Sequence, residues 1–321
     1  MRAVVLSQFG APSELVLTEV PDVVAGLGEV VIAVEFASIT FVETQVRAGH
    51  PPHPSMAPSL PVIPGNGVGG TIISAGPGAD AALLGRKVVS TTGGSGGYAE
   101  MVAVNVADLI GLPAEVSMAD AVALLADGRT AMALMAAAAV DTGEVVLVEA
   151  AAGGVGTLLV QLAAAAGAKV VAAAGGSAKL ALAVELGADL PVDYTAPDWL
   201  ERVRREVGEV DVVFDGVGGA TGLAAFGLLR RGGRCCTYGM ASGQFAWIPD
   251  DAAAGRDITL LRGAPVTPER MRALTAAALD AAASGTLRPV IGQRYPLVDA
   301  AAAHAAIEAR STVGKTLLTT S

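Results

Sequence analysis

A glycine-rich turn between an apolar run and a helical segment constrains the fold of this chain most. Val145–Val148 is apolar at every position, which is typical of a strand buried on both faces, and Thr157–Ala166 has helical spacing. The turn between them reads Glu149-Ala150-Ala151-Ala152-Gly153-Gly154-Val155-Gly156. Gly153 would let phosphates approach the backbone, and Gly156 would let the helix pack closely against the strand. The helix N-terminus would present N–H groups to the phosphates, so the pattern predicts a dinucleotide-binding turn.

The same alternation of strand and helix continues along the chain. Further short apolar runs occur at Val170–Ala173, Val210–Phe214 and Arg234–Tyr238, and the helical segment Ala178–Leu186 ends at a glycine. Strands that alternate with helices in this way predict an α/β domain with a doubly wound parallel sheet.

The segments on either side of this pattern have a different character. The first part contains six short runs bounded by turn residues, namely Arg2–Leu6, Leu15–Val20, Glu29–Phe36, Gly69–Ser74, Arg86–Ser90 and Tyr98–Val104, which predict an antiparallel β domain or barrel. Ala48–Pro64 is expected to be a loop, and Ser117–Ala139 to be helical with a break at Asp127–Thr130. The tail is expected to fold as a helix, a strand, a helix and a strand, at Pro268–Ser284, Val290–Tyr295, Val298–Ala309 and Lys315–Thr319.

The end of the second parallel strand bears on the choice of dinucleotide. An acidic residue there would bind the ribose 2′-hydroxyl of NAD, but the residues are Ala174-Gly175-Gly176-Ser177-Ala178-Lys179. The Ser177 hydroxyl and the Lys179 ammonium could both bind a 2′-phosphate, so the sequence favours NADPH. Two alternatives stay open: Lys179 as a solvated residue of the first helical turn, and Ser177 as a helix N-cap.

A second glycine-rich segment follows the strand Val210–Phe214. It reads Asp215-Gly216-Val217-Gly218-Gly219 and would bring Gly216 and Val217 close to a ligand at the carboxyl edge of the sheet. Asp215 would either contact the ligand or cap the next helix.

Charge and composition exclude several classes of protein. The 321 residues carry a net charge of −10 and the pI is about 4.8, so nucleic acid is not an expected partner. The apolar stretch Thr157–Gly176 contains Gly167 and Lys169, which argues against a membrane span. The adjacent Cys235 and Cys236 would point to opposite faces of a strand rather than pair, and no signal peptide is evident, so we expect a cytoplasmic protein.

Four segments together resemble a known family. These are Glu149–Gly156, Gly96–Glu100, Gly128–Ala131 and Arg310–Lys315. They look like those of medium-chain dehydrogenase/reductases, and most like the zinc-independent quinone oxidoreductases, over essentially the whole chain. The resemblance implies a GroES-like β-barrel catalytic domain formed by residues 1–120 and 257–321, with a Rossmann domain of residues 121–256 inserted between them.

The resemblance also implies particular cofactor contacts. The family's A-x-x-G-x-x-G motif falls on Ala150, Gly153 and Gly156, and a lysine near the 2′-phosphate falls on Lys179. Further contacts fall on Thr130 beside the nicotinamide, on Tyr194 beside the adenosine phosphate, and on Gly239 and Met240 along the ring. Lys315 lies near a C-terminal cofactor contact of the family, with an exposed strand lysine as the alternative.

Zinc is not expected. The positions that align with the catalytic zinc ligands of related alcohol dehydrogenases read Thr40, Asn66 and Ala126, and four closely spaced cysteines are missing from the sequence. His50 and His53 form a pair without a third ligand nearby.

The implied reaction is hydride transfer from NADPH to a quinone or another α,β-unsaturated carbonyl compound. We expect Thr40 to hydrogen-bond the oxygen of the acceptor, with Gln45 as the second candidate. The alternative for each is a polar residue that only lines the cleft. Where the family often has Asn, Asp and Tyr, this chain has Thr40, Glu43 and Gln45, and Pro51 replaces a further Tyr, which leaves the substrate open.

Alternatives remain for the function and the assembly. An enoyl-thioester reductase of the same superfamily and a non-catalytic, redox-sensing NADPH-binding protein would share the cofactor site. The apolar segment Ile258–Leu261 is expected to be an edge strand, and since the family commonly forms dimers in this region, we expect a homodimer.

Overall fold

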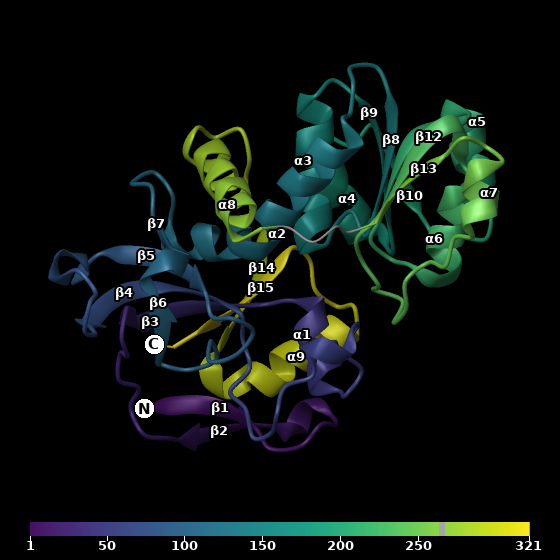
Figure 1. Cartoon of the computed structure of the whole chain (residues 1–321). Helices are drawn as coiled ribbons and strands as arrows, with labels where there is room; N and C mark the ends of the chain where they lie inside the picture. The colour runs from purple at the N-terminus through teal and green to yellow at the C-terminus, as the bar shows by residue number, and fades with distance from the viewer. Residues whose placement is uncertain (263–266, 321) are drawn as a thin grey trace. The chain divides into compact units, whose positions relative to one another are not determined.

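The computed structural model describes residues 1–262 and 267–320, and they form two compact units (Figure 1). Unit 1 contains Met1–Gly128 and Thr275–Ser321, and unit 2 contains Arg129–Leu274. Both units are built around a β-sheet, but the pairing of their strands differs.

Unit 1 is mainly antiparallel. A hairpin of β1 (Arg2–Leu6) and β2 (Leu15–Glu19) accompanies a seven-stranded sheet in the order β14-β15-β3-β4-β5-β7, with β6 also paired to β3. The strands of this sheet are β3 (Glu29–Ile39), β4 (Gly67–Ala75), β5 (Lys87–Thr91), β6 (Met101–Asn105), β7 (Leu109–Gly111), β14 (Ile291–Pro296) and β15 (Lys315–Thr319). Only β14 and β15 pair in parallel. The predicted antiparallel β domain is confirmed.

Two helices of unit 1 lie side by side (Figure 1). They are α1 (Phe41–Arg47) and α9 (Ala300–Glu308), and five short 3₁₀ turns complete the described elements, at Pro12–Glu14, Pro54–Met56, Ala81–Leu83, Val106–Asp108 and Leu297–Asp299. The core beneath them is formed by alternate residues of the strands, such as Ile32, Ile72 and Leu318, which are almost completely inaccessible to solvent.

Helices α2 (Met118–Ala138) and α8 (Pro268–Ala283) each contain residues of both units. The predicted break at Asp127–Thr130 is wrong, because α2 is continuous. A Cβ atom on Gly128 would lie 2.8 Å from the Cβ atom of Ala278 and 3.0 Å from Leu124 Cδ2. Gly128 therefore serves close packing against α8 rather than helix termination, at an intrinsic cost of about 1 kcal/mol relative to alanine.

Unit 2 is a six-stranded parallel sheet in the order β10-β9-β8-β11-β12-β13. Its strands are β8 (Val145–Glu149), β9 (Lys169–Ala174), β10 (Leu190–Asp193), β11 (Val210–Asp215), β12 (Leu229–Thr237) and β13 (Thr259–Arg262). Figure 1 shows α3 (Gly154–Ala165) and α4 (Ser177–Glu185) on one face of the sheet, and α5 (Trp199–Val207), α6 (Gly219–Phe226) and α7 (Asp250–Ala254) on the other. The predicted doubly wound sheet is confirmed, and β10 and α5 were not foreseen.

Two further sequence expectations can be compared with unit 2. Of the described residues, 257–262 and 267–274 fall in this unit rather than with the C-terminal part of unit 1, and β13 pairs with β12. The stretch Thr157–Gly176 is divided into α3, a turn at Gly167 with φ +81° and strand β9. Within the described ranges, α2 is the helix that is long and apolar enough to cross a membrane, yet its residues Ala121–Leu125 are buried in the protein.

Candidate functional site

The carboxyl ends of five parallel strands bring most of the predicted cofactor residues to one edge of unit 2. After β8 come Ala150, Gly153, Gly154, Val155 and Gly156; after β9, Ser177 and Lys179; after β10, Tyr194; after β11, Gly216 and Val217; after β12, Gly239 and Met240. The strand order reverses between β8 and β11, which is where open α/β sheets bind ligands. Thr130 is also a predicted cofactor residue of unit 2, but it lies on α2 and not at a strand end.

Backbone geometry dictates the residues of the turn after β8. Ala150 has φ +48°, and its carbonyl accepts a hydrogen bond of 2.7 Å from the Gly153 N–H. A Cβ atom on Gly156 would lie 2.2 Å from the same carbonyl oxygen, so only glycine fits. Gly153 is the N-cap, and α3 begins at Gly154, three residues earlier than the helical spacing had indicated. The N–H groups of the first helical turn, which lack partners within the helix, suit an anionic ligand.

The turn after β9 joins the chain that follows β10. Gly176, with φ +90°, is the N-cap of α4, so Ser177 is its first helical residue and not the cap. The Gly176 N–H donates to Asp193 Oδ2 at 3.1 Å. A Cβ atom on Gly175 would lie 3.7 Å from Tyr194 Cε2, which places the tyrosine ring beside the turn.

Asp193 is a residue of this edge that the sequence had not assigned. Its Oδ1 atom accepts hydrogen bonds from the Thr195 hydroxyl at 2.6 Å and from the Thr195 N–H at 2.9 Å. These bonds lower the pKa of the carboxyl group, which therefore stays ionised. The carboxylate orients the two adjacent turns.

The turns after β11 and β12 pack on one another. A Cβ atom on Gly239 would lie 2.4 Å from the Gly216 carbonyl oxygen, and one on Gly216 would lie 2.5 Å from the Tyr238 hydroxyl. Asp215 is fully buried, and its Oδ1 atom accepts a hydrogen bond of 2.7 Å from the N–H of Gly218, the N-cap of α6. This bond goes to the N-cap residue itself, and α6 has no side-chain cap hydrogen bond, so Asp215 is not the cap of this helix. Its buried neighbour at the end of β8, Glu149, was not predicted as a site residue.

In unit 1, the predicted substrate residue Thr40 is the N-cap of α1. Its hydroxyl donates to Glu43 Oε2 at 2.9 Å and accepts from the Glu43 N–H at 3.4 Å. The Thr40 N–H also donates to Glu43 Oε2, at 2.6 Å, and the Asn66 N–H donates to Oε1 at 2.9 Å. Burial nevertheless raises the pKa of Glu43 against these hydrogen bonds and the nearby Lys315. Gln45 lies one turn further on, where its amide donates to Thr44 Oγ1 at 3.2 Å.

Lys315 is not the exposed strand lysine that the sequence left open. It is buried, and its Nζ atom pairs with Asp127 Oδ1 at 2.9 Å. Nearby, the buried Tyr98 hydroxyl lies 3.1 Å from His304 Nε2. Burial, with the positive charge of Arg47, lowers the pKa of His304 to about 3, so the imidazole is neutral. These pairs are formed by residues far apart in the sequence.

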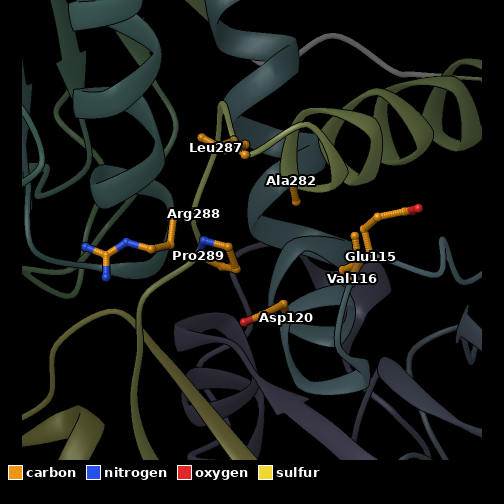
Figure 2. Close-up of a pocket in the computed structure, with 8 residues that line it drawn as sticks. Glu115, Val116, Asp120, Ala282, Leu287, Arg288 and Pro289 are labelled. Atoms are coloured by element: carbon orange, nitrogen blue, oxygen red, sulfur yellow. The ribbon is translucent and has the colours of Figure 1, made fainter.

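A pocket of about 200 Å³, lined mainly by apolar residues, lies elsewhere in unit 1, between the start of α2 and the end of α8 (Figure 2). Its acidic residue Asp120 accepts a hydrogen bond of 2.7 Å from the Ser117 hydroxyl and so belongs to the N-terminal cap of α2. In Figure 2, the Arg288 side chain extends away from Asp120 and Glu115. The residues that line the pocket include no predicted site residue.

Metal ligands can be sought directly. Over residues 1–262 and 267–320 there is no group of three or more His, Cys, Asp or Glu side chains able to hold a metal ion. His53 caps the turn Pro54–Met56, and His50 is exposed in the same loop.

Comparisons with known proteins agree with this architecture. Residues 26–114 match the family model described as alcohol dehydrogenase GroES-like domain, and residues 186–318 match the one described as zinc-binding dehydrogenase. Human quinone oxidoreductase is 31% identical over 95% of this chain and 93% of its own. A 2-haloacrylate reductase of a Burkholderia species is 29% identical over 99% and 98%. The structure of Escherichia coli quinone oxidoreductase in complex with NADPH is 28% identical, covers 99% of this chain and 100% of its own, and has a TM-score of 0.91.

The two family models, the whole-length identity and the structural likeness all point to one family, with a GroES-like domain and a Rossmann-like parallel sheet. The chain is an oxidoreductase that belongs to the quinone oxidoreductase family of medium-chain dehydrogenase/reductases.

Proposed function

We propose that this protein uses NADPH to reduce a quinone or another α,β-unsaturated carbonyl compound, without zinc. The observation that carries the proposal is the edge of unit 2, where the turn after β8 excludes a side chain at Gly156 and five strand ends present predicted cofactor residues. The quinone oxidoreductases named above and the NADPH complex of one of them support the same reaction.

The residues at this edge fit the cofactor. The first turn of α3 would bind the pyrophosphate, and Ser177 and Lys179, with Tyr194 beside them, would bind the 2′-phosphate and the adenosine. Gly239 and Met240 would follow the nicotinamide, with Thr130 as a further contact. NADPH supplies the hydride, and the protein supplies placement in a site that excludes water.

Thr40 would contact the oxygen of the acceptor, with Gln45 as a second polar contact. A hydroxyl group has one hydrogen, and while Glu43 is ionised the Thr40 hydrogen is directed to its carboxylate. A protonated Glu43 would instead donate to Thr40 Oγ1, which frees the Thr40 hydrogen for the oxygen that gains negative charge. The raised pKa of Glu43 favours this arrangement.

Steady-state assays separate the possible functions. We expect NADPH to be oxidised with quinones or enones, and more slowly with enoyl thioesters; a preference for the thioesters would favour an enoyl-thioester reductase. Binding of NADPH without turnover of any acceptor would favour a redox-sensing protein. The name of the 2-haloacrylate reductase justifies adding a haloacrylate to the panel.

Zinc independence is tested in the same assay. After dialysis against a strong chelator, the rate should be unchanged, and added zinc should not increase it. A loss of activity that zinc restores would contradict this part of the proposal.

We also propose that the protein is a cytoplasmic homodimer that pairs through β13. Among the described residues this strand ends the sheet of unit 2 and so has an open edge, and Trp247, which precedes α7 in the chain, is 85% exposed. Sedimentation equilibrium should give twice the chain mass, and a monomer at micromolar concentration would contradict the pairing.

A further inference from the structure

Two carboxyl groups lie together inside unit 2 without serving any role proposed so far. Glu149 ends β8 and Asp215 ends β11, and the register of these neighbouring parallel strands pairs Val148 with Phe214. The next residue of each strand therefore lies side by side at the carboxyl edge. Both Glu149 and Asp215 have an exposed fraction of 0%.

The hydrogen bonds of this pair are incomplete without a proton between them. Glu149 Oε2 accepts from the Val217 N–H at 3.3 Å, and Asp215 Oδ1 accepts from the Gly218 N–H at 2.7 Å. The other oxygen of each carboxyl group, Glu149 Oε1 and Asp215 Oδ2, has no donor among the residues that the structure describes. Two adjacent carboxylates are strongly disfavoured away from water, whereas a single proton would let one carboxyl group hydrogen-bond the other.

The surroundings of the pair leave little room for it to separate. A Cβ atom on Gly222 of α6 would lie 2.6 Å from Asp215 Oδ2, so the helix backbone closes over the carboxyl group. From the chain after β12, the Tyr238 hydroxyl donates to the backbone carbonyl of Glu149 at 3.3 Å. The Cys235 thiol of β12 also faces the pair, and burial together with Asp215 raises the pKa of this thiol.

We propose that Glu149 and Asp215 share one proton and that this proton fixes the Gly216–Gly218 turn, which makes the two carboxyl groups positioning residues for the dinucleotide. The inference rests on the function proposed above, because Gly216 and Val217 are assigned to the cofactor site. The two N–H groups that the pair accepts belong to this turn, so a change in the pair moves the turn directly.

The direction of the pH dependence follows from the buried proton. Burial, and next the negative charge of Asp215, raise the pKa of Glu149 well above its usual range. Within the described residues, the groups that shift the pKa values of Glu149 and Asp215 include no cation that would compensate a second negative charge. Loss of the proton at alkaline pH leaves two repelling carboxylates, and the affinity for NADPH should then fall.

The test is the dissociation constant of NADPH, measured by the fluorescence of the bound nicotinamide from about pH 6 to about pH 10. For the wild type we expect the constant to rise by up to about tenfold per pH unit above the pKa of the pair. In Glu149→Gln, the amide would supply the bridging hydrogen permanently, and in Asp215→Asn it would do so from the other side. The dissociation constant of NADPH for each single variant should therefore change by less than about twofold over the pH range in which the wild type loses affinity.

A matched control is Glu144→Gln, at the residue directly before the start of β8. Glu144 is paired with Arg234, which lowers the pKa of Glu144. This variant should therefore lose affinity for NADPH at alkaline pH as the wild type does. The phosphate of NADPH also titrates, so the wild-type curve alone does not show that the pair loses a proton. The evidence is the difference in pH dependence between the amide variants and the wild type.

A spectroscopic measurement on the unmodified protein covers the case in which the variants fail to fold. The infrared spectrum at neutral pH should contain the C=O stretch of a protonated carboxyl group that disappears at alkaline pH. Absence of this band, or an alkaline loss of affinity that is equal in the wild type and both amide variants, would overturn the shared proton. A wild type that binds no NADPH at any pH would instead overturn the proposed function.

Discussion

The two candidate regions are built from different parts of the chain. At the edge of unit 2, backbone atoms define the site: the Ala150 carbonyl excludes a side chain at Gly156, and the Gly216 carbonyl excludes one at Gly239. Around α1 of unit 1, side chains define it, through the Thr40–Glu43 hydrogen bond and the buried Lys315–Asp127 pair. In a site defined by the backbone, a few positions accept only glycine. In a network of side chains, the loss of either partner breaks the interaction.

The regions also differ in how they handle buried charge. Glu149 and Asp215 in unit 2 have each other as neighbours, whereas Asp127 in unit 1 has the ammonium group of Lys315. A pair of opposite charges is stable when complete and costly when broken, but a pair of acids depends on a proton and therefore on pH.

Breaking the ion pair of unit 1 should have the largest effect on stability. Lys315→Met leaves the Asp127 carboxylate buried without its partner, and we expect the free energy of unfolding to fall by about 4 kcal/mol. Urea denaturation measures this change. The double variant Lys315→Met/Asp127→Leu should recover most of the loss, and Lys87→Met, at an exposed position of β5, should cost less than about 0.5 kcal/mol. A single variant as stable as the wild type would contradict the buried pair.

Adding a methyl group at Gly156, in the turn after β8, should have the second-largest effect on stability. Gly156→Ala places a carbon atom against the Ala150 carbonyl, and we expect a loss of about 3 kcal/mol together with weaker NADPH binding. Thermal unfolding and a binding titration measure the two effects. Gly111→Ala is the control, since a Cβ atom there meets nothing within 4 Å. Equal melting temperatures for both variants would show that the turn relaxes.

Removing one charge at the proposed phosphate site should have a smaller effect, confined to binding. Lys179→Ala should raise the dissociation constant of NADPH by about 10- to 50-fold and change that of NADH by less than about twofold. Lys169→Ala, at the exposed start of β9, should leave both constants unchanged. Equal weakening of NADPH and NADH by Lys179→Ala would exclude a 2′-phosphate contact.

The smallest expected effect is the pH dependence that Glu43 contributes to stability. Because the pKa of this acid is raised in the folded protein, the fold holds the proton more tightly than the unfolded chain does. The contribution is fully present below the pKa of the unfolded chain, about 4.5, and is lost as the pH rises through the folded pKa.

Glu43→Gln should therefore become more stable relative to the wild type as the pH rises from 4.5 to neutrality. Denaturation curves at several pH values measure the difference. The exposed Glu35→Gln on β3 should run parallel to the wild type. A constant difference between Glu43→Gln and the wild type would mean that the folded pKa is not raised.

Local signals were sufficient for most of the fold. Short, mainly apolar runs predicted β8, β9, β11 and β12, because the residues of these strands that form the core are apolar at most positions. By contrast, β10 was missed, since its run Leu190–Asp193 contains a proline and ends in an acid. The break proposed at Gly128 failed because contact with α8 favours glycine there, and that contact is not visible in the local sequence.

By itself, the sequence determined the dinucleotide-type turn, the parallel sheet and four of the five strand ends that carry predicted cofactor residues, those of β8, β9, β11 and β12. These follow from short-range rules, since a tight turn or a buried strand restricts residues that are neighbours in the chain. Only the tertiary structure decided that Thr40 shares its hydrogen with Glu43, that Lys315 is buried against Asp127, and that Glu149 lies beside Asp215. The protonation and pairing of a side chain depend on the groups that folding places around it, and those groups come from distant parts of the sequence.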